Sequence, residues 1–299
     1  MKKTTQVKIV LKKYLPNNIF TITKKIFNNT YNKIEEYIFL KRTANFTYPK
    51  YINIDDKGVA FELLIDPKNG VLDKYLSINT KYERHITEQM HNHIKAGDIV
   101  LDIGANIGLH TILLAKITGN SGQVHAFEPI PSIYTQLEKS IEKNNIKNIR
   151  VEKFALGEKQ EELDININLG CVASSSILDK DVSNMTTNIK IQVKTLDSLN
   201  LQKVDFIKLD VEGYEWNVIA GGMNTIKRYK PTIIFEYSPD YFRRAGNNDG
   251  NKILNFMINN NYIMYDLENK KKMVADIKSF EKEFAPGLRS QTNLLCVQQ

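Results

Sequence analysis

The chain has 299 residues and a net charge of +7, and its 42% hydrophobic and 25% charged residues are typical of a soluble protein with a full core. Its two cysteines, Cys171 and Cys296, lie far apart in sequence, which excludes a disulfide framework and a zinc-knuckle spacing. No apolar run reaches the length of a membrane span, and the N-terminus lacks the compact apolar core of a signal peptide. We therefore expect a cytoplasmic protein.

The positive charge is concentrated at the N-terminus. Residues 1–34 hold eight lysines and no acid, so the rest of the chain has 33 basic against 34 acidic groups. Apolar residues alternate with these lysines, which makes the arm a candidate for peripheral contact with the anionic inner face of a membrane. The simpler interpretation is a solvated, partly helical lead-in. We expect no nucleic-acid binding, because no aromatic stacking platform accompanies the lysines.

The pattern of elements divides the chain at about residue 80. We expect residues 1–80 to form the basic arm and a small extension, with helix first, then short strands around the turn at Lys57 and Gly58, and then another helix. Residues 81–299 open with an amphipathic helix that ends at Gly97. From there apolar strands alternate with helices of about 10 to 15 residues, which predicts an α/β fold with a doubly wound, mostly parallel sheet and helices on both faces.

The expected elements follow one another regularly from residue 99. Predicted strands are 99–104, 122–129, 149–157, 204–212 and 231–238, and predicted helices are 106–118, 131–145, 215–229 and 251–261. Two alternating stretches, 162–169 and 189–196, flank a polar loop from Gly170 to Asn188. Two C-terminal stretches, 262–268 and 292–299, predict a closing antiparallel strand pair.

Acidic residues, an asparagine and glycines gather where the predicted parallel strands end, the edge at which such sheets bind ligands. They are Asp102, Gly104, Asn106 and Gly108 after the first strand, Glu128 after the second, Asp210 and Glu212 after the fourth, and Glu236 after the fifth.

The first of these turns, in VLDIGANIGLH, discriminates among nucleotides. A dinucleotide fingerprint needs three glycines, but Asn106 and Leu109 stand where the second and third would follow Gly104. Asp102 also precedes the turn, and an acid there disfavours a phosphate but favours a positively charged ligand. No G-K-[ST] follows, which excludes a phosphate-binding loop. S-adenosylmethionine, which carries positive charge and no phosphate, fits this turn.

Glu128, in HAFEP, is the predicted ribose ligand. It lies 22 residues after Asn106, which suits one crossover helix, and a carboxylate there can accept both ribose hydroxyls. NAD enzymes use the same device, so Glu128 does not choose the cofactor by itself. The alternative role is that of an acid at the start of the helix near Pro129 and Pro131.

These segments, with ALGE, VKTLDSL, VDFIKLDVEGYEWNVIAGG and PTIIFEYSP in this order, resemble the FkbM-type family of S-adenosylmethionine-dependent methyltransferases. The similarity covers roughly residues 80–240 and implies a class I, Rossmann-like methyltransferase fold. The resemblance implies that the methionine part of the cofactor is held by Asp102, Gly104, Asn106 and Gly108, the ribose by Glu128, and the adenine by Ala155 and Leu156.

The resemblance also places Asp210 and Glu212 opposite the methyl group and the acceptor. Methyl transfer to a hydroxyl needs the oxygen in line with the methyl carbon and a base for the hydroxyl proton. Asp210, directly after an apolar strand, is the predicted base, and Lys208 on the same strand face is predicted to position it. Glu236 is an acid inside an apolar strand, which is unfavourable unless it is paired or used.

Other roles stay open for these acids. A divalent metal shared by Asp210, Glu212 and Glu236 is a second way to activate a hydroxyl, but we do not favour it, because no metal-ligand spacing is recognisable. Glu212 and Glu215 are also placed to cap the following helix.

Three further residues are expected near the cofactor. Tyr82 and Glu83 precede the predicted sheet and are candidates for a lid over the cofactor, and His110 is expected to pack beside the cofactor loop.

We expect an O-methyltransferase that acts on a sugar hydroxyl of a surface glycan or glycolipid. One alternative is an N-methyltransferase: residues 238–241, SPDY, resemble an amine-binding motif but follow the fifth strand instead of the fourth. A non-catalytic binding protein with this fold is another. An NAD oxidoreductase is disfavoured by the missing glycines.

Overall fold

The computed structural model describes residues 48–67, 70–168, 186–244, 249–270, 272–285 and 288–299. The expectations for residues 1–34, and for most of the loop from Gly170 to Asn188, lie outside these residues. The segment from Tyr48 to Gln299 forms one compact unit. Within the described ranges no helix is both long and apolar enough to cross a membrane.

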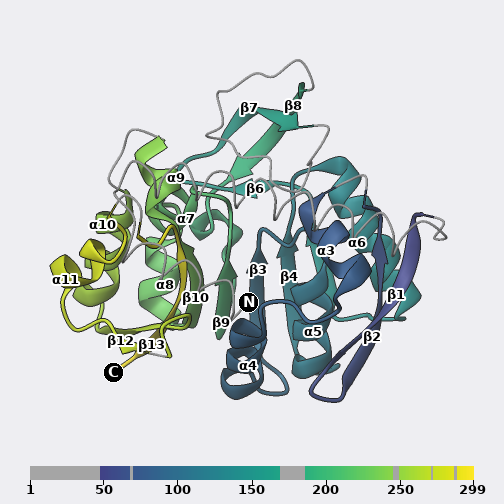
Figure 1. Cartoon of the computed structure of the whole chain (residues 1–299), viewed down its shortest axis with the longest axis horizontal. Coiled ribbons are helices and arrows are strands. Elements are labelled where there is room, and N and C mark those ends of the chain that lie inside the picture. The colour runs from purple at the N-terminus through teal and green to yellow at the C-terminus, as the bar shows by residue number, and fades with distance from the viewer. Residues whose placement is uncertain (1–47, 68–69, 169–185, 245–248, 271, 286–287) are drawn as a thin grey trace, which may run out of the picture. The chain divides into compact units, whose positions relative to one another are not determined.

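A central eight-stranded sheet forms the middle layer of this unit (Figure 1). Its parallel part contains β5 (Ile149–Glu152), β4 (Gln123–Phe127), β3 (Ile99–Ile103), β9 (Phe206–Leu209) and β10 (Thr232–Tyr237), in that spatial order. The sheet continues antiparallel with β13 (Thr292–Gln298), β11 (Tyr262–Asp266) and β12 (Lys272–Met273). The chain order reverses between β3 and β9, so the predicted doubly wound sheet and its closing antiparallel pair are confirmed.

Helices cover both faces of the sheet, as predicted. One face packs against α4 (Arg84–His93), α5 (Leu109–Thr118) and α6 (Pro131–Lys143), and the other against α7 (Glu215–Ala220), α8 (Met223–Tyr229) and α10 (Asp249–Asn259).

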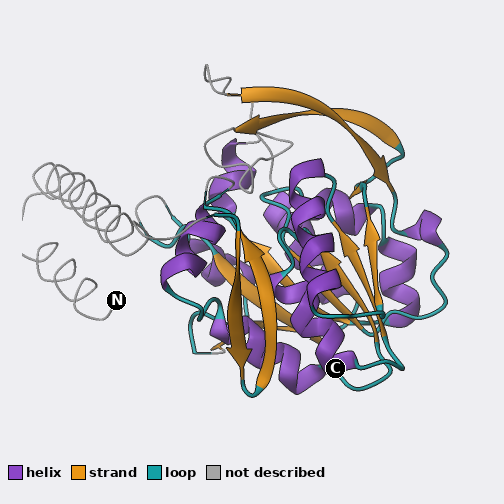
Figure 2. Cartoon of the chain, turned by 90° about the vertical axis from the view of Figure 1, so that its right-hand side faces the viewer, coloured by secondary structure: helices purple, strands orange, loops and turns teal. Residues whose placement is uncertain are grey.

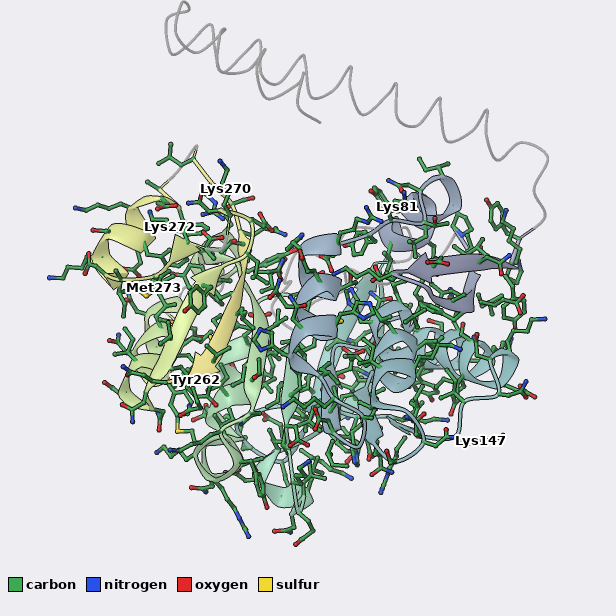
Figure 3. All side chains as sticks on the ribbon, turned by 90° about the horizontal axis from the view of Figure 1, so that it is seen from below. Lys81, Lys147, Tyr262, Lys270, Lys272 and Met273 are labelled. Atoms are coloured by element: carbon green, nitrogen blue, oxygen red, sulfur yellow. The ribbon has the colours of Figure 1, made fainter. Side chains whose placement is uncertain are left out.

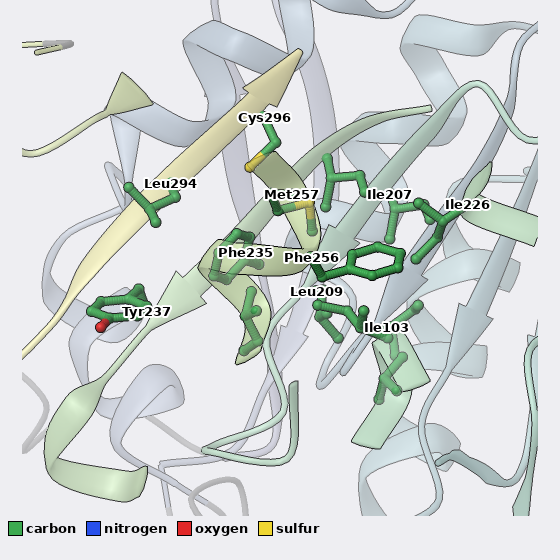
Figure 4. Packing of buried hydrophobic residues seen from close by; sticks show 14 of the residues in the cluster. Ile103, Ile207, Leu209, Ile226, Phe235, Tyr237, Phe256, Met257, Leu294 and Cys296 are labelled. Atoms are coloured by element: carbon green, nitrogen blue, oxygen red, sulfur yellow. The ribbon is translucent and has the colours of Figure 1, made fainter. Parts of the chain in front are cut away.

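Side chains alternate between these two layers along each strand. In β10, Ile234 belongs to the first layer, whereas Ile233 and Phe235 belong to the second. Figure 4 shows Phe235 packed with Met257 and Cys296 in the second layer. Lysines lie on the outer surface of both ends of the unit, among them the labelled Lys81, Lys147, Lys270 and Lys272 (Figure 3).

The predicted short strands before residue 80 form a hairpin of β1 (Lys50–Asp56) and β2 (Val59–Ile65), followed by α3 (Val71–Ile78). The apolar face of β2 packs with α5 in one hydrophobic cluster. Side chains of Ser140 in α6 and of Asn144, the residue that caps the C-terminal end of α6, form hydrogen bonds with the backbone of β2. Asn144 Oδ1 accepts from the Glu62 N–H at 2.9 Å, Asn144 Nδ2 donates to the Glu62 carbonyl at 2.6 Å, and Ser140 Oγ accepts from the Leu64 N–H at 3.0 Å.

A second sheet, at the top of Figure 1, contains β6 (Ala155–Leu156), β8 (Thr186–Lys194) and β7 (Glu161–Asn168), and its hairpin arches over the helices in Figure 2. The single strand predicted over 149–157 was therefore wrong, because the chain leaves the central sheet after Glu152 and pairs with β8 instead. Phe154 marks the break, since its ring turns into the second hydrophobic layer and meets the Phe127 ring edge-on at 5.7 Å.

The helix predicted over 215–229 is divided into α7 and α8. Gly221 ends α7 where the backbone comes close to another segment: a Cβ there would lie 1.9 Å from the Gly157 carbonyl oxygen. Two helices had no clear sequence signal, α9 (Pro239–Arg244) and α11 (Ile277–Lys282).

The hydrogen bonds from α6 predict how firmly the hairpin is held. Asn144→Ala removes three hydrogen bonds and leaves both backbone groups of Glu62 unpaired at a partly buried position, so we expect it to lower the free energy of unfolding by about 1 to 3 kcal/mol in urea denaturation. Glu142→Ala, on the exposed side of the same turn, is the control and should be close to neutral. Equal stability of the two variants would contradict the anchoring role of Asn144.

Candidate functional site

A cavity of about 420 Å³ lies at the carboxyl ends of β3, β4 and β9, within the size range of small-molecule sites. Eight of the eleven site residues predicted from the sequence line it: Gly104, Asn106, Glu128, Ala155, Leu156, Lys208, Asp210 and Glu212. Ala155 follows β5 and Asp210 follows β9, and these two strands lie on opposite sides of the β3–β4 pair. The two residues therefore mark opposite ends of the row of strand ends, with Glu128 between them.

The loop after β3 forms the floor of the cavity. Gly104 has a φ of +83°, and Asn106, at a φ of +50°, also adopts the left-handed conformation. The N–H groups of Gly104 and Ala105 both donate to the Phe127 carbonyl, which ties the loop to the end of β4. A Cβ on Gly104 would lie 1.9 Å from the Asp210 carbonyl oxygen. Only glycine therefore fits at residue 104.

Gly108 does not line the cavity. It directly precedes α5 and has a φ of +94°, and a Cβ there would lie 2.3 Å from Leu137 Cδ1, so its role is to let α5 approach α6.

Glu128 links two loops through its carboxylate. Its Oε2 accepts from the Asn106 N–H at 3.0 Å, and its Oε1 accepts from the Ile130 N–H at 2.9 Å. Burial raises the pKa of Glu128 to about 7, although these two hydrogen bonds oppose the rise. Each carboxylate oxygen keeps a lone pair for a further donor, which is what a ribose with two adjacent hydroxyls requires.

Asp102 lies beneath the loop and does not line the cavity. It is fully buried, its Oδ2 accepts from Thr111 Oγ1 at 2.6 Å, and its Oδ1 has no hydrogen-bond partner. The Lys208 ammonium lies 3.8 Å from that Oδ1. Burial raises the pKa of Asp102, and Lys208 opposes the rise.

The end of the cavity at Ala155 and Leu156 is apolar. Ile165 from β7, Ile191 from β8 and Tyr214 complete it. A flat, uncharged group such as adenine matches these walls. The sequence placed 162–169 and 189–196 in an insertion, and nothing in their alternating pattern showed that this insertion reaches the site.

The opposite end is lined by charged residues. Lys208 Nζ, buried at the end of β9, lies 3.3 Å from Asp210 Oδ2 and 3.4 Å from the Gly104 carbonyl oxygen. Glu212, two residues after Asp210, has a φ of +53°. Burial raises the pKa of Glu212, and so does the charge of Asp210.

Tyr82 and Glu83 also line this end, from the turn before α4. Glu83 has a φ of +42°, and its Oε2 lies 3.7 Å from His110 Nε2. Burial, and then the charge of Asp210, raise the pKa of Glu83 to about 7. Burial lowers the pKa of His110 well below its usual value, so its imidazole is neutral, and the buried Nε2 has no hydrogen-bond partner. The sequence indicated these three residues, but not that Glu83 would line the same cavity as Asp210.

Glu236 does not line the cavity. Its Oε1 accepts from Gln291 Nε2 at 2.7 Å, and burial, followed by the nearby Asp210 and Glu212, raises its pKa. Glu215 caps its own turn: its Oε1 accepts from the N–H groups of Val211 and Gly213. In the parts of the chain that the structure describes, no group of three or more His, Cys, Asp or Glu residues is arranged to hold a metal ion.

The close approach at Gly104 generates a test of the loop. Gly104→Ala adds backbone strain and a clash with a carbonyl, so we expect it to lower the free energy of unfolding by roughly 3 kcal/mol or more. Gly58→Ala is the control: Gly58 has a similar φ of +86°, but a Cβ there meets nothing within 4 Å, so about 1 kcal/mol of strain is expected. If chemical denaturation shows a similar loss of unfolding free energy for both variants, the close contact with the Asp210 carbonyl does not add to the destabilisation.

Residues 102–264, more than half of the chain, match the methyltransferase FkbM domain family. The chain is 24% identical to Methyltransferase 1 of Beauveria bassiana over 143 residues, which cover 41% of this chain and only 57% of that protein. It is 23% identical over 220 residues to the hexuronic acid methyltransferase AglP of Haloferax volcanii, covering 72% of this chain and 82% of AglP.

Solved structures resemble the chain more distantly. The FkbM methyltransferase of Methylobacillus flagellatus superimposes with a TM-score of 0.42 and 17% identity, over 78% of this chain and 56% of that one. An S-adenosylmethionine-dependent O-methyltransferase of Thermotoga maritima gives 0.41 and 12%, over 83% and 78%. The predicted class I methyltransferase fold is confirmed, and the chain belongs to the methyltransferase FkbM domain family of S-adenosylmethionine-dependent methyltransferases.

Proposed function

We propose that this protein transfers the methyl group of S-adenosylmethionine to a hydroxyl oxygen, and that the hydroxyl belongs to a sugar of a glycan or glycolipid. The observation that carries the proposal is the pair of carboxylates, Asp210 and Glu83, that line one end of the cofactor-sized cavity. The sugar is suggested by the similarity to the hexuronic acid methyltransferase of Haloferax volcanii.

The cavity residues fit the cofactor. When bound, S-adenosylmethionine supplies a methyl group already activated by the sulfonium. Glu128 has free lone pairs for the ribose hydroxyls, and the backbone of Gly104 can lie close to the methionine part because residue 104 has no side chain. The apolar end at Ala155 and Leu156 suits the adenine.

The remaining task of the protein is to orient the acceptor and accept its proton. The sugar hydroxyl loses a proton as it attacks, and a carboxylate within hydrogen-bond reach can accept it. Asp210 remains our proposed base, because Lys208 fixes its carboxylate at the strand end. Glu83, on the turn before α4, is a second carboxyl group that lines the cavity.

No observation favours an amine acceptor. The segment 238–241 leads into α9, and none of its residues lines the cavity.

The acceptor and the base can be tested together in a strain that lacks the gene. We expect mass spectrometry of its glycans and glycolipids to show one component that has lost a methyl group, and the wild-type gene to restore it. Asp210→Asn should fail to restore the methyl group while its affinity for S-adenosylmethionine stays within about threefold. Asp164→Asn, at an exposed position of β7, is the matched control and should restore it fully.

Two outcomes would count against the proposal. An unchanged glycan and lipid profile in the deletion strain, with a methyl group lost from an amine elsewhere, would overturn the proposed acceptor. Full restoration by Asp210→Asn would remove Asp210 from the role of base.

The raised pKa of Glu128 predicts a pH dependence of cofactor binding. The ionised carboxylate accepts from the ribose hydroxyls, and the pKa is about 7 in the free protein, so affinity should rise about tenfold from pH 6 to pH 8 and then level off. Calorimetry with S-adenosylhomocysteine measures this dependence. Glu128→Gln should weaken binding and flatten the profile, whereas Glu83→Gln should leave the slope in place; a flat wild-type profile would contradict the role of Glu128.

A further inference from the structure

One wall of the cavity is formed by a helix that lies outside the matched family domain. Leu72 and Tyr75 of α3 line the cavity, and residues three apart share one face of a helix. This helix precedes the matched segment 102–264. The family domain therefore does not determine what this wall binds.

The other side of α3 is fixed in the core. Leu76 is buried in the first hydrophobic layer, and Asp73 is fully buried. Asp73 Oδ1 accepts from the Asp66 N–H at 2.7 Å and from Gln136 Nε2 of α6 at 2.7 Å. The helix is thus a firm support for the two side chains that line the cavity.

Tyr75 contributes an exposed aromatic ring to this wall. Its side chain is 37% exposed, and of the large hydrophobic side chains that are exposed in the described ranges it alone lines the cavity. Its hydroxyl accepts from Asn79 Nδ2 at 2.6 Å and donates to the Lys81 carbonyl at 3.2 Å. The ring is therefore oriented before a ligand arrives, which lowers the entropic cost of binding to it.

The ring of Tyr82 forms a corner with that of Tyr75. Their centroids lie 5.4 Å apart and their planes meet at 65°. Edge-to-face contact covers at most one face of one ring, and the exposed part of Tyr75 is left for a ligand. Burial raises the pKa of Tyr82, and the charges of Glu83 and Asp210 add to the rise. The corner is therefore close to the proposed base.

The chemistry of this wall fits a sugar ring. A pyranose has hydroxyls around its edge and C–H groups on its faces, and the negative face of an aromatic ring attracts such C–H groups. A sugar packed on Tyr75 and Leu72 would keep its edge hydroxyls free for Asp210. The adenine does not compete for this wall, because the apolar end at Ala155 and Leu156 suits it.

We propose that Tyr75 is the platform on which the sugar ring of the acceptor packs, with Leu72 beside it, and that it determines the specificity for the acceptor. This inference rests on the proposed function, because it concerns acceptor recognition at the same site.

The platform can be tested with the whole protein, labelled S-adenosylmethionine and an extract of glycans and glycolipids from the deletion strain. Tyr75→Ala should raise the apparent KM for the extract about tenfold and leave kcat close to the wild-type value. Calorimetry should show an unchanged affinity for S-adenosylhomocysteine. Tyr75→Phe keeps the ring and loses the hydroxyl, so its KM should stay close to that of the wild type, whereas Tyr75→Leu, which is apolar but not flat, should resemble Tyr75→Ala.

The matched control is Tyr51→Ala. Tyr51 is 39% exposed, lies on β1 and does not line the cavity, so its substitution should leave KM and kcat unchanged. Thermal unfolding of each variant checks that the fold is intact. Saturation-transfer NMR with oligosaccharides released from the extract gives a readout without turnover: saturation should reach sugar C–H protons in the wild type and be lost in Tyr75→Ala.

The platform is overturned if folded Tyr75→Ala keeps the wild-type KM, if Tyr75→Leu restores it, or if Tyr75→Phe loses it. A weakened affinity of Tyr75→Ala for S-adenosylhomocysteine would also overturn it, since Tyr75 would then belong to the cofactor pocket. If the wild-type protein transfers no label to the extract, the proposed function is contradicted and the platform fails with it. Transfer of label that does not depend on Tyr75 overturns the platform alone, so the two failures are distinguishable.

Discussion

The site depends on one buried ammonium group. Lys208 joins the end of β9 to the loop after β3, because its Nζ faces Asp210, Asp102 and the Gly104 carbonyl together. Burial alone would lower its pKa, but Asp210 and Asp102 hold the pKa above its usual value, so the side chain stays charged. Without this ammonium group two carboxylates would face each other at low dielectric, which is strongly unfavourable. The loop and the strand end are thus held in one arrangement by charge balance as well as by backbone contact.

Much of the fold was predictable because its signals are local. Apolar strands alternating with helices gave the layers, and polar residues at successive strand ends indicated the edge at which the cavity lies. Asn106 and Asp102 pointed away from a dinucleotide because their chemistry differs from that of the expected glycines and phosphate neighbours. These inferences required no knowledge of distant contacts.

The rest depended on contacts between segments far apart in the chain. Glu83 lines the same cavity as Asp210 from the turn before α4, where residue 83 has a left-handed conformation, and a glutamate carries no sequence signal for that conformation. The break between β5 and β6 follows from the burial of Phe154, and the break between α7 and α8 follows from the approach of Gly221 to Gly157. The apolar residues of the β7–β8 hairpin could equally have packed elsewhere, so their place at the site was not readable from their alternation.

Glu128 has a consequence for how the site assembles. One carboxylate receives N–H groups from Asn106 and from Ile130, so it ties the loop after β3 to the start of α6. Donors on a ligand would share the same two oxygens. The ordering of the two loops and the binding of the ligand are then linked thermodynamically, so that whatever strengthens one must strengthen the other by the same free energy. Substitution of Glu128 would consequently report on preorganisation of the loops as well as on contact with the ribose.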